Sequence, residues 1–241
     1  MNKITVTCPS RGRAQLFQRY LQSLADTASY PERIEILSYL DNDDPSRMEY
    51  ISLAKLLTID PIYQKFLNID FLGGDRIGAL ESANVLAKHG QGHIIMAMND
   101  DVIIRTKGWD ERIDQEAAKY PDQIYVMYFN DGEHGEDVSA FPIISRRWFE
   151  ALNSFLSPLF FHYCADLWLQ DLANRLGRRI YISDVLAEHM NPEFSKGEKD
   201  ATYHDLHHQS KIARDWLKYR DFERYRELDA AILRKLLGTK P

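Results

Sequence analysis

The sequence is poor in cysteine, lacks long apolar runs and carries no excess of basic residues. Its two cysteines, Cys8 and Cys164, form no CxxC motif and are too few for a disulfide framework. The longest apolar runs are about seven residues, whereas a membrane-spanning helix needs about 20. A strand pattern begins directly after Met1 and leaves no room for a secretory signal. We therefore expect a cytoplasmic protein without a membrane span.

The charge balance is acidic, with 30 Lys and Arg against 36 Asp and Glu, and a net charge of −6. Binding to bulk nucleic acid depends on counterion release from a clustered basic face. The balance therefore disfavours DNA as a partner without excluding it. A small molecule that carries phosphate remains open, because short basic runs occur at Arg11/Arg13, Arg146/Arg147 and Arg178/Arg179.

Strand-like and helix-like patterns alternate through the first hundred residues. Short apolar or β-branched runs cover 3–8, 34–40 and 92–98, and segments with helical spacing lie between them. This alternation predicts an α/β domain over residues 1–202, with a mostly parallel, buried sheet and helices on both faces. Residues 203–241 are predicted to form a helical C-terminal extension packed on that domain.

The ends of the predicted strands carry most of the chemistry in this half of the chain. In α/β sheets, ligands collect at the carboxyl ends of parallel strands. Asp100 and Asp101 follow such a strand and repel each other unless a cation lies nearby. A divalent metal with oxygen ligands explains the pair, and a solvated turn is the alternative. The four strand ends are Pro9–Arg13, Asp41–Asp44, Gly73–Arg76 and Asn99–Asp101.

The order of these blocks resembles that of nucleotide-sugar glycosyltransferases of the GT-A fold, similar to family 2. The blocks are "TVTCPSRGR", "LDNDD", "GGDRIGALESAN" and "GHIIMAMNDDVI", followed by "PIISRRWFEAL", "FHYCADLWLQDLANRLG" and "VLAEHMNP". The resemblance covers roughly residues 3 to 192. It implies a GT-A (Rossmann-like) fold, a nucleoside diphosphate sugar as donor, with UDP favoured, and Mn²⁺ or Mg²⁺ as cofactor.

The resemblance also implies roles for individual residues. Asp101 and His189 would bind the metal, and Asp166 would be the general base that takes the proton of the acceptor hydroxyl. Donor binding is expected at Pro9, Ser10, Arg11, Arg13, Asp41, Gly74, Arg76, Gly78, Asn84, Asn99 and Asp100.

The sequence departs from the family pattern at two places. Asn99 stands where a DxD triplet has its first carboxylate, and Ala165 precedes Asp166 where a Glu-Asp pair is usual. Asn99 can still hydrogen-bond a sugar hydroxyl. Asp166 can also be interpreted as an acid that stabilises the first turn of a helix. His189 can also be interpreted as a structural histidine without a metal.

Two features of the later sequence leave alternatives open. His204, His207 and His208 include an i,i+4 pair of the kind that zinc sites use, but a solvated helix face is the expected interpretation. The polar stretch "NPEFSKGEKDATYHD" is either a loop that closes over the donor, with Lys196 or Lys199 near the diphosphate, or an exposed connector.

These observations predict a metal-dependent glycosyltransferase, inverting by analogy, that acts on a cytosolic hydroxyl acceptor. The acceptor is a saccharide, a lipid-linked sugar, a protein or a hydroxymethylated base in phage DNA, and the last requires a basic groove. A nucleotidyltransferase is one alternative, although the long glycine-rich N-terminal loop typical of that class is missing. A non-catalytic nucleotide- or sugar-binding module is the other. The oligomeric state is not predicted. The basic groove would use Arg146, Arg147, Arg178, Arg179 and the Lys and Arg residues of the tail.

Overall fold

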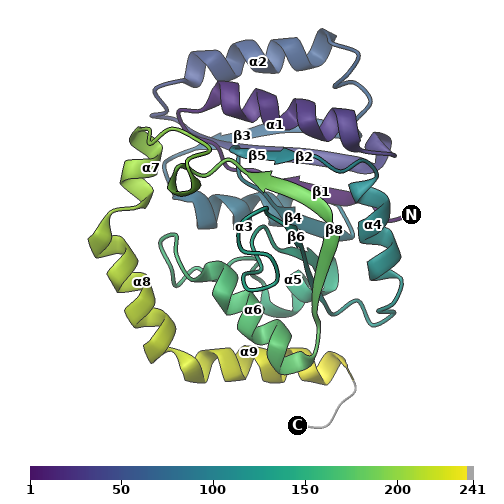
Figure 1. Ribbon diagram of the computed structural model, residues 1–241, viewed down its shortest axis with the longest axis vertical. Helices are drawn as coiled ribbons and strands as arrows, with labels where there is room; N and C mark the ends of the chain where they lie inside the picture. Colours follow the sequence, from purple (N-terminus) through teal and green to yellow (C-terminus); the bar gives the residue numbers. More distant parts are fainter. Residues whose placement is uncertain (238–241) are drawn as a thin grey trace.

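The computed structural model describes residues 1–237, which form a mostly parallel sheet with helices on both faces (Figure 1). The strand order is β3-β2-β1-β4-β7-β6-β8-β5. Strands β1 to β4 run parallel to one another, β7 is antiparallel to β4 and β6, and β5 is antiparallel to β8. This confirms the predicted α/β architecture. The strands are β1 (Ile4–Thr7), β2 (Ile34–Asp41), β3 (Asn68–Gly74), β4 (Ile94–Ala97), β5 (Val102–Ile104), β6 (Val126–Asn130), β7 (Ile143–Ser145) and β8 (Arg179–His189).

Alternating strand residues divide most of the interior into two large hydrophobic cores, one on each face of the sheet, and a third, small cluster holds Leu37, Tyr39 and Leu86. In β4, Ile94 and Met96 point into one core, and Ile95 and Ala97 point into the other. The first core lies against α1, α2 and α4, and the second lies against α3, α5, α6 and α9. The helices before residue 200 are α1 (Ala14–Thr27), α2 (Arg47–Ile59), α3 (Ala79–His89), α4 (Trp109–Ala117), α5 (Arg146–Leu152) and α6 (Ala165–Leu176), with 3₁₀ turns at Pro31–Arg33 and Pro192–Phe194.

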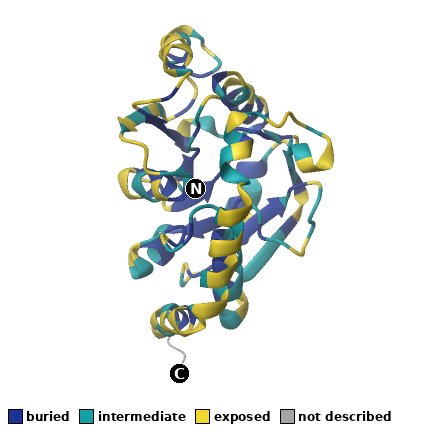
Figure 2. Cartoon of the chain, turned by 90° about the vertical axis from the view of Figure 1, so that its left-hand side faces the viewer, coloured by how far each residue is buried: buried dark blue, intermediate teal, exposed yellow. Residues whose placement is uncertain are grey.

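The C-terminal segment forms three consecutive helices: α7 (Ala201–Leu206), α8 (Gln209–Asp221) and α9 (Glu223–Leu236). Helix α9 packs on α5 and α6 and buries Ala230 and Leu233 in the second core. Helix α8 leaves Trp216 and Leu217 exposed. It runs along one edge of the molecule in Figure 1, and in Figure 2, where this edge faces the viewer, most of its outer surface is exposed. The domain boundary at 202/203 stays a prediction, and residues 238–241 of the predicted extension lie outside the described residues. Within residues 1–237, every helix is too short or too polar to cross a bilayer.

Candidate active site

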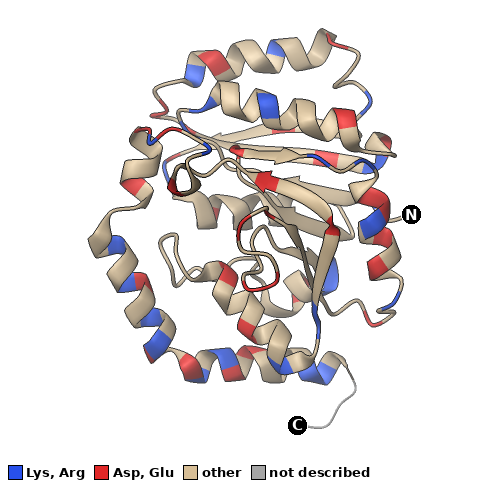
Figure 3. Cartoon of the chain, in the orientation of Figure 1, with Lys and Arg blue, Asp and Glu red and all other residues tan. Residues whose placement is uncertain are grey.

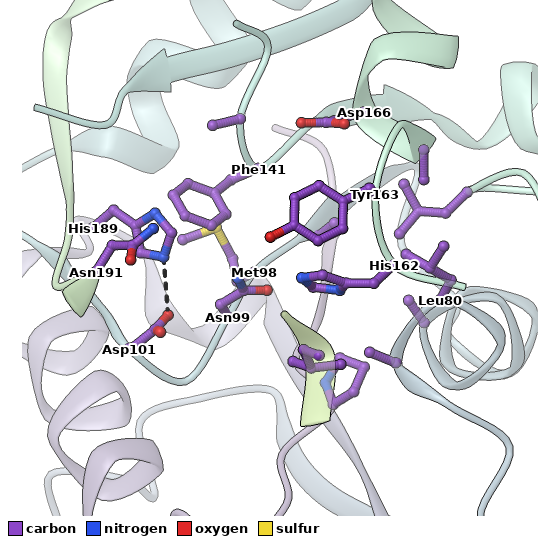
Figure 4. A pocket seen from close by; sticks show the side chains of 18 of the residues that line it. Leu80, Met98, Asn99, Asp101, Phe141, His162, Tyr163, Asp166, His189 and Asn191 are labelled. Atoms are coloured by element: carbon purple, nitrogen blue, oxygen red, sulfur yellow. Dashed lines mark ion pairs between the residues drawn. The ribbon is translucent and has the colours of Figure 1, made fainter. Parts of the chain in front are cut away.

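The candidate site lies at the carboxyl ends of β1 and β4. These strands pair in parallel, with Thr7 opposite Ala97, so the segments that follow them lie side by side. Residues 9–13 and 99–101 contribute to one side of a cavity of about 340 Å³. The other side is built largely by residues 162–166, which lead into α6. Figure 4 shows Asp101 on one side of this space and Asp166 on the other.

Asp100 and Asp101 are both buried, with 4% and 8% exposure, but they face different partners. Asp100 accepts hydrogen bonds from Ser10 Oγ at 2.6 Å and from Arg13 Nη1 at 3.2 Å. Ser10 is in turn 2.6 Å from the hydroxyl of Tyr50. Burial, with the adjacent charge of Asp101, raises the pKa of Asp100 to about 7, while Arg13 and Ser10 oppose that shift. Asp100 is therefore tied to β1 and its loop rather than to the open cavity.

Asp101 faces the cavity and lies next to His189. Residue Val102 pairs with His189 in the antiparallel β5–β8 ladder, which brings the two strand ends together. Asp101 Oδ1 lies 3.4 Å from His189 Nε2 (Figure 4). Phe141 meets the imidazole ring edge-on at 5.0 Å. Burial would raise the pKa of Asp101, but the interaction with His189 and the charge of Arg13 bring it below its ordinary value.

The Asp101–His189 pair fits two ligands of one divalent metal ion. Asp101 Oδ1 is buried and has no hydrogen-bond partner among residues 1–237. Two adjacent ligands of an octahedral ion with bonds of ~2.1 Å lie ~3 Å apart, close to the observed 3.4 Å. The described residues contain no cluster of three or more His, Cys, Asp or Glu side chains suited to a metal. The pair would therefore need further ligands, from the amide side chains of Asn99 or Asn191 in the cavity wall or from a bound substrate.

Arg13 connects three carboxylates and ties a distant segment to the site. Besides Asp100 it contacts Asp101 at 3.4 Å, and it binds Asp200 through two nitrogens at 2.6 and 2.8 Å. Asp200 also caps α7 by accepting from the backbone N–H of Tyr203. The polar stretch after β8 is therefore held against the end of β1 and is not a free connector.

Helix α7 places an aromatic pair in the cavity wall. The rings of Tyr203 and His207 stack at 3.9 Å, and both residues line the cavity. His204 and His208 are exposed and do not line the cavity, although the His204 ring meets Tyr203 edge-on at 5.7 Å. The expectation of a solvated face therefore fits His204 and His208 but not His207. Lys196 does not face the cavity, because it pairs with Glu133 and Glu188.

Asp166 lines the cavity from the first turn of α6, so its two interpretations are compatible. Cys164 precedes the helix in a left-handed conformation (φ 68°), which turns the chain into α6. Asp166 Oδ1 accepts a hydrogen bond from the backbone N–H of Leu167 at 2.8 Å. Burial nevertheless raises the pKa of Asp166, with the Leu167 bond opposing.

Sequence reasoning missed Asp131 and His134, which also line the cavity. Asp131 is 1% exposed and accepts a hydrogen bond from His134 Nδ1 at 2.6 Å, and its carbonyl accepts from the His189 N–H at 3.0 Å. It therefore orients the His134 ring and fixes the backbone of His189. The sequence contained a sign of Asp131, because "YFND" is another strand pattern followed by an acid. In the structure β6 runs in the same direction as β1 and β4, so its end lies at the same edge of the sheet.

Several residues predicted to bind the donor lie outside this cavity. Arg11 pairs with Asp41 at 2.9 Å, where β1 and β2 end. Gly78 has φ +85° and open space where a side chain would begin. Arg76 pairs with Asp205 of α7. These residues form a separate polar edge that borders the site, and their donor contacts stay predictions.

Two further residues that were predicted to bind the sugar donor, Gly74 and Asn84, make contacts within the protein that explain why these residue types occur there. A Cβ at Gly74 would lie 2.2 Å from the Tyr39 hydroxyl, so Tyr39 itself requires a glycine there. The Asn84 amide binds the backbone of Phe155 and Leu156 at 2.8 to 3.0 Å and holds that loop against α3. Donor contacts of Gly74 and Asn84 also stay predictions.

Solved structures with a similar fold are glycosyltransferases. The mannosyltransferase PcManGT from Pyrobaculum calidifontis, in complex with GDP-Man and Mn²⁺, superposes with a TM-score of 0.67 at 13% identity, over 96% of this chain and 70% of that chain. S. aureus TarS 1-349 in complex with UDP-GlcNAc gives 0.54 at 14% identity, over 85% and 64%. The same protein with UDP gives 0.57, over 77% and 60%.

This chain has a glycosyltransferase-like fold. At 13 to 14% identity the likeness concerns the fold alone, because one fold hosts many activities. The chain spans less than two thirds of the length of the TarS structures. No family model and no curated protein matches the sequence. The function must therefore be argued from the site.

Proposed function

We propose that this protein is a metal-dependent glycosyltransferase that moves a sugar from a nucleoside diphosphate sugar to a hydroxyl acceptor. The observation that carries the proposal is the pairing of Asp101 Oδ1 with His189 Nε2 at 3.4 Å, beside Arg13 and in the same cavity as Asp166. A candidate metal-binding pair, a cationic side chain and a candidate base thus share one space. The fold of proteins solved with GDP-Man and UDP-GlcNAc supports the same reaction.

In the proposed reaction, the acceptor oxygen attacks the anomeric carbon of the donor, and the bond from that carbon to the diphosphate breaks. Asp101 and His189 would hold a divalent ion, Mn²⁺ or Mg²⁺, which offsets the negative charge on the departing diphosphate. Arg13 would add a positive charge close to the phosphates, while its guanidinium stays bound to Asp200, Asp100 and Asp101. Asp166 receives the acceptor proton. A single displacement inverts the anomeric centre.

A saccharide or another small hydroxyl acceptor suits the surface better than duplex DNA. The arginines expected to form a basic groove are engaged within the fold: Arg146 with the carbonyls of Ala87, Gly90 and Gly92, Arg147 and Arg178 with Asp122, and Arg179 with Ser139. Acidic and basic residues are mixed along α9, whereas α8 is mostly basic (Figure 3). Of the basic residues of α8, Lys211 and Lys218 contact Phe161 and Leu159 within the fold, and Arg220 pairs with Asp221. Neither region presents a continuous basic face of the kind that DNA binding needs.

The proposal is tested with UDP-, GDP-, dTDP- and CMP-linked sugars, each with and without Mn²⁺. One base class, with UDP favoured, is expected to raise the melting temperature, because ligand binding stabilises the native state. Release of nucleoside diphosphate in the presence of an acceptor indicates glycosyl transfer, whereas pyrophosphate release from a triphosphate indicates a nucleotidyltransferase. Binding without turnover indicates a binding module. Activity that persists in EDTA contradicts the metal role.

A further inference from the structure

Helix α8 holds the cavity loop that leads into Asp166, and it does so with polar side chains. Lys211, Asp215 and Lys218 are spaced i, i+4 and i+7, so they share one helix face. Lys211 Nζ lies 4.0 Å from the centre of the Phe161 ring, and Lys218 donates a hydrogen bond to the carbonyl of Leu159. Residues 159–163, called the cavity loop below, therefore have their conformation set by a helix far along the chain.

Asp215 makes the central contact of this helix with the cavity loop. It is 0% exposed, and its carboxylate accepts hydrogen bonds from the backbone N–H groups of Phe161, His162 and Tyr163 at 2.9 to 3.0 Å. A buried carboxylate is tolerated only when its oxygens are satisfied, and successive amides that converge on one anion form a specific concave site. The three amides can point at one carboxylate only while the loop keeps this shape.

The cavity loop presents an unsatisfied polar atom, His162 Nδ1. This nitrogen is buried and has no hydrogen-bond partner within the described part of the chain. Burial, with His207 adding to it, lowers the pKa of His162 to about 4, so its ring is neutral near pH 7. Figure 4 shows the side chains of His162 and Tyr163 among those that line the cavity. A neutral imidazole binds an uncharged polar group without bringing a charge into the cavity.

We propose that His162 Nδ1 hydrogen-bonds a hydroxyl group of the acceptor, and that Asp215 is the positioning residue that holds His162 for this contact. The inference rests on the proposed glycosyl transfer. The acceptor is assigned because the cavity loop continues directly into Asp166, the candidate base, and lies on the opposite side of the cavity from Asp101 (Figure 4). Helix α8 is then part of the acceptor site although it contributes no side chain to the cavity wall.

The test compares His162→Phe and Asp215→Asn with two matched controls. His89→Phe changes an exposed histidine in the last turn of α3, and Asp221→Asn changes an exposed acid of α8 that pairs with Arg220. Acceptor probes are the methyl glycosides of glucose, galactose, mannose and N-acetylglucosamine. Donor binding is followed by the melting-temperature shift with Mn²⁺ and the nucleotide sugar that stabilises the wild type.

His162→Phe is expected to lower kcat/KM for the acceptor by ~10- to 100-fold, since a lost hydrogen bond at a buried site has about this effect. The donor-induced shift should not change. Asp215→Asn should raise the acceptor KM while donor binding persists, because the three backbone N–H groups lose the negative charge on which they converge. Both controls should stay within about twofold of the wild type, as surface changes usually do. If Asp215→Asn does not fold, His162→Phe alone decides.

Unchanged acceptor kinetics in His162→Phe, or an equal loss of donor binding, overturns the inference. If the wild-type protein itself binds no nucleotide sugar, the proposed function is wrong, and the inference is not what failed. Crystals soaked with UDP, Mn²⁺ and the same methyl glycosides give a readout independent of turnover. A sugar hydroxyl within hydrogen-bond distance of His162 Nδ1 is expected, and the absence of any sugar contact with this nitrogen contradicts the assignment.

Discussion

The two sides of the cavity are built by different means. On the strand-end wall, made of Arg13, Asp101 and His189, the pairing of β1 with β4 and of β5 with β8 brings the residues together. On the loop wall, made of His162, Tyr163 and Asp166, the position of the backbone depends on Asp215, 54 positions away from Phe161 along the chain. Sheet register assembles the first wall, whereas one remote carboxylate shapes the second.

The two walls also differ in charge. Arg13 lies among three carboxylates, and Asp101 keeps a pKa below its ordinary value. On the loop wall, burial raises the pKa of Asp166 and lowers that of His162. Charged groups therefore concentrate on the side suited to a metal and a diphosphate, and groups that resist ionisation concentrate on the side suited to a neutral hydroxyl. This division agrees with the proposed donor and acceptor sides.

Removing the proposed metal-binding carboxylate should have the largest effect. Asp101→Ala is expected to abolish Mn²⁺-dependent transfer, because the ion would lose its carboxylate ligand and the leaving diphosphate its counter-charge. Steady-state rates with and without Mn²⁺ measure this. Asp43→Ala is the control, because its exposed side chain pairs with Arg11 outside the cavity. Equal Mn²⁺ dependence in Asp101→Ala and wild type would remove Asp101 from the metal site.

Asp166→Asn should lower the transfer rate by ~10²- to 10⁴-fold, the range of general base catalysis. Donor binding on the strand-end wall should persist, which separates the two walls experimentally. Because burial raises the pKa of Asp166, the base is ionised only above that raised value. Wild-type kcat/KM is therefore expected to fall on acidification at a higher pH than an ordinary aspartate would give. If kcat/KM of Asp166→Asn falls at the same acidic pH as that of the wild type, another group is responsible for the fall.

The smallest expected effect concerns stability on the loop wall. The folded-state pKa of His162 is lowered to about 4 from 6.5. Between these two pH values the unfolded chain binds more protons at His162 than the folded protein does. The free energy of unfolding therefore falls as the pH drops from 6.5 to 4, and the contribution of His162 is complete above pH 6.5. Urea unfolding at several pH values should show a weaker pH dependence in His162→Phe than in His89→Phe. Identical slopes would mean that His162 titrates normally.

Local patterns predicted part of the strand-end wall. Asp101 follows an apolar run typical of a buried strand, and the parallel arrangement inferred from alternation places such ends together. His189 was predicted from the resemblance to GT-A glycosyltransferases and not from a local pattern. The rule could have been carried further, because Asp131 also follows a strand, β6, and lines the same cavity. Gly74 and Asn84, which were predicted to bind the donor, show where such reasoning fails. Their neighbours in the fold are Tyr39 and the backbone of Phe155, and the sequence contained no sign of these contacts.

The loop wall could not be predicted in this way. Asp215 looks like an ordinary acid on an amphipathic helix, between Arg214 and Trp216. None of the residues next to Asp215 in the sequence indicates that backbone amides from another part of the chain bind its carboxylate. The same holds for the Arg13–Asp200 contact, which joins residues 187 positions apart.

The sequence by itself determined the α/β alternation and the acidic strand ends, because strand and helix periodicity and the chemistry of strand ends are local properties. The pairing of Asp101 with His189 was implied only by the resemblance to GT-A glycosyltransferases. Only the tertiary structure decided which acids face the cavity, which bind a backbone amide or an arginine, and which histidine is left with an unpaired nitrogen. Burial and partner choice depend on contacts between segments far apart in the chain, and these contacts set the charge of each group in the site.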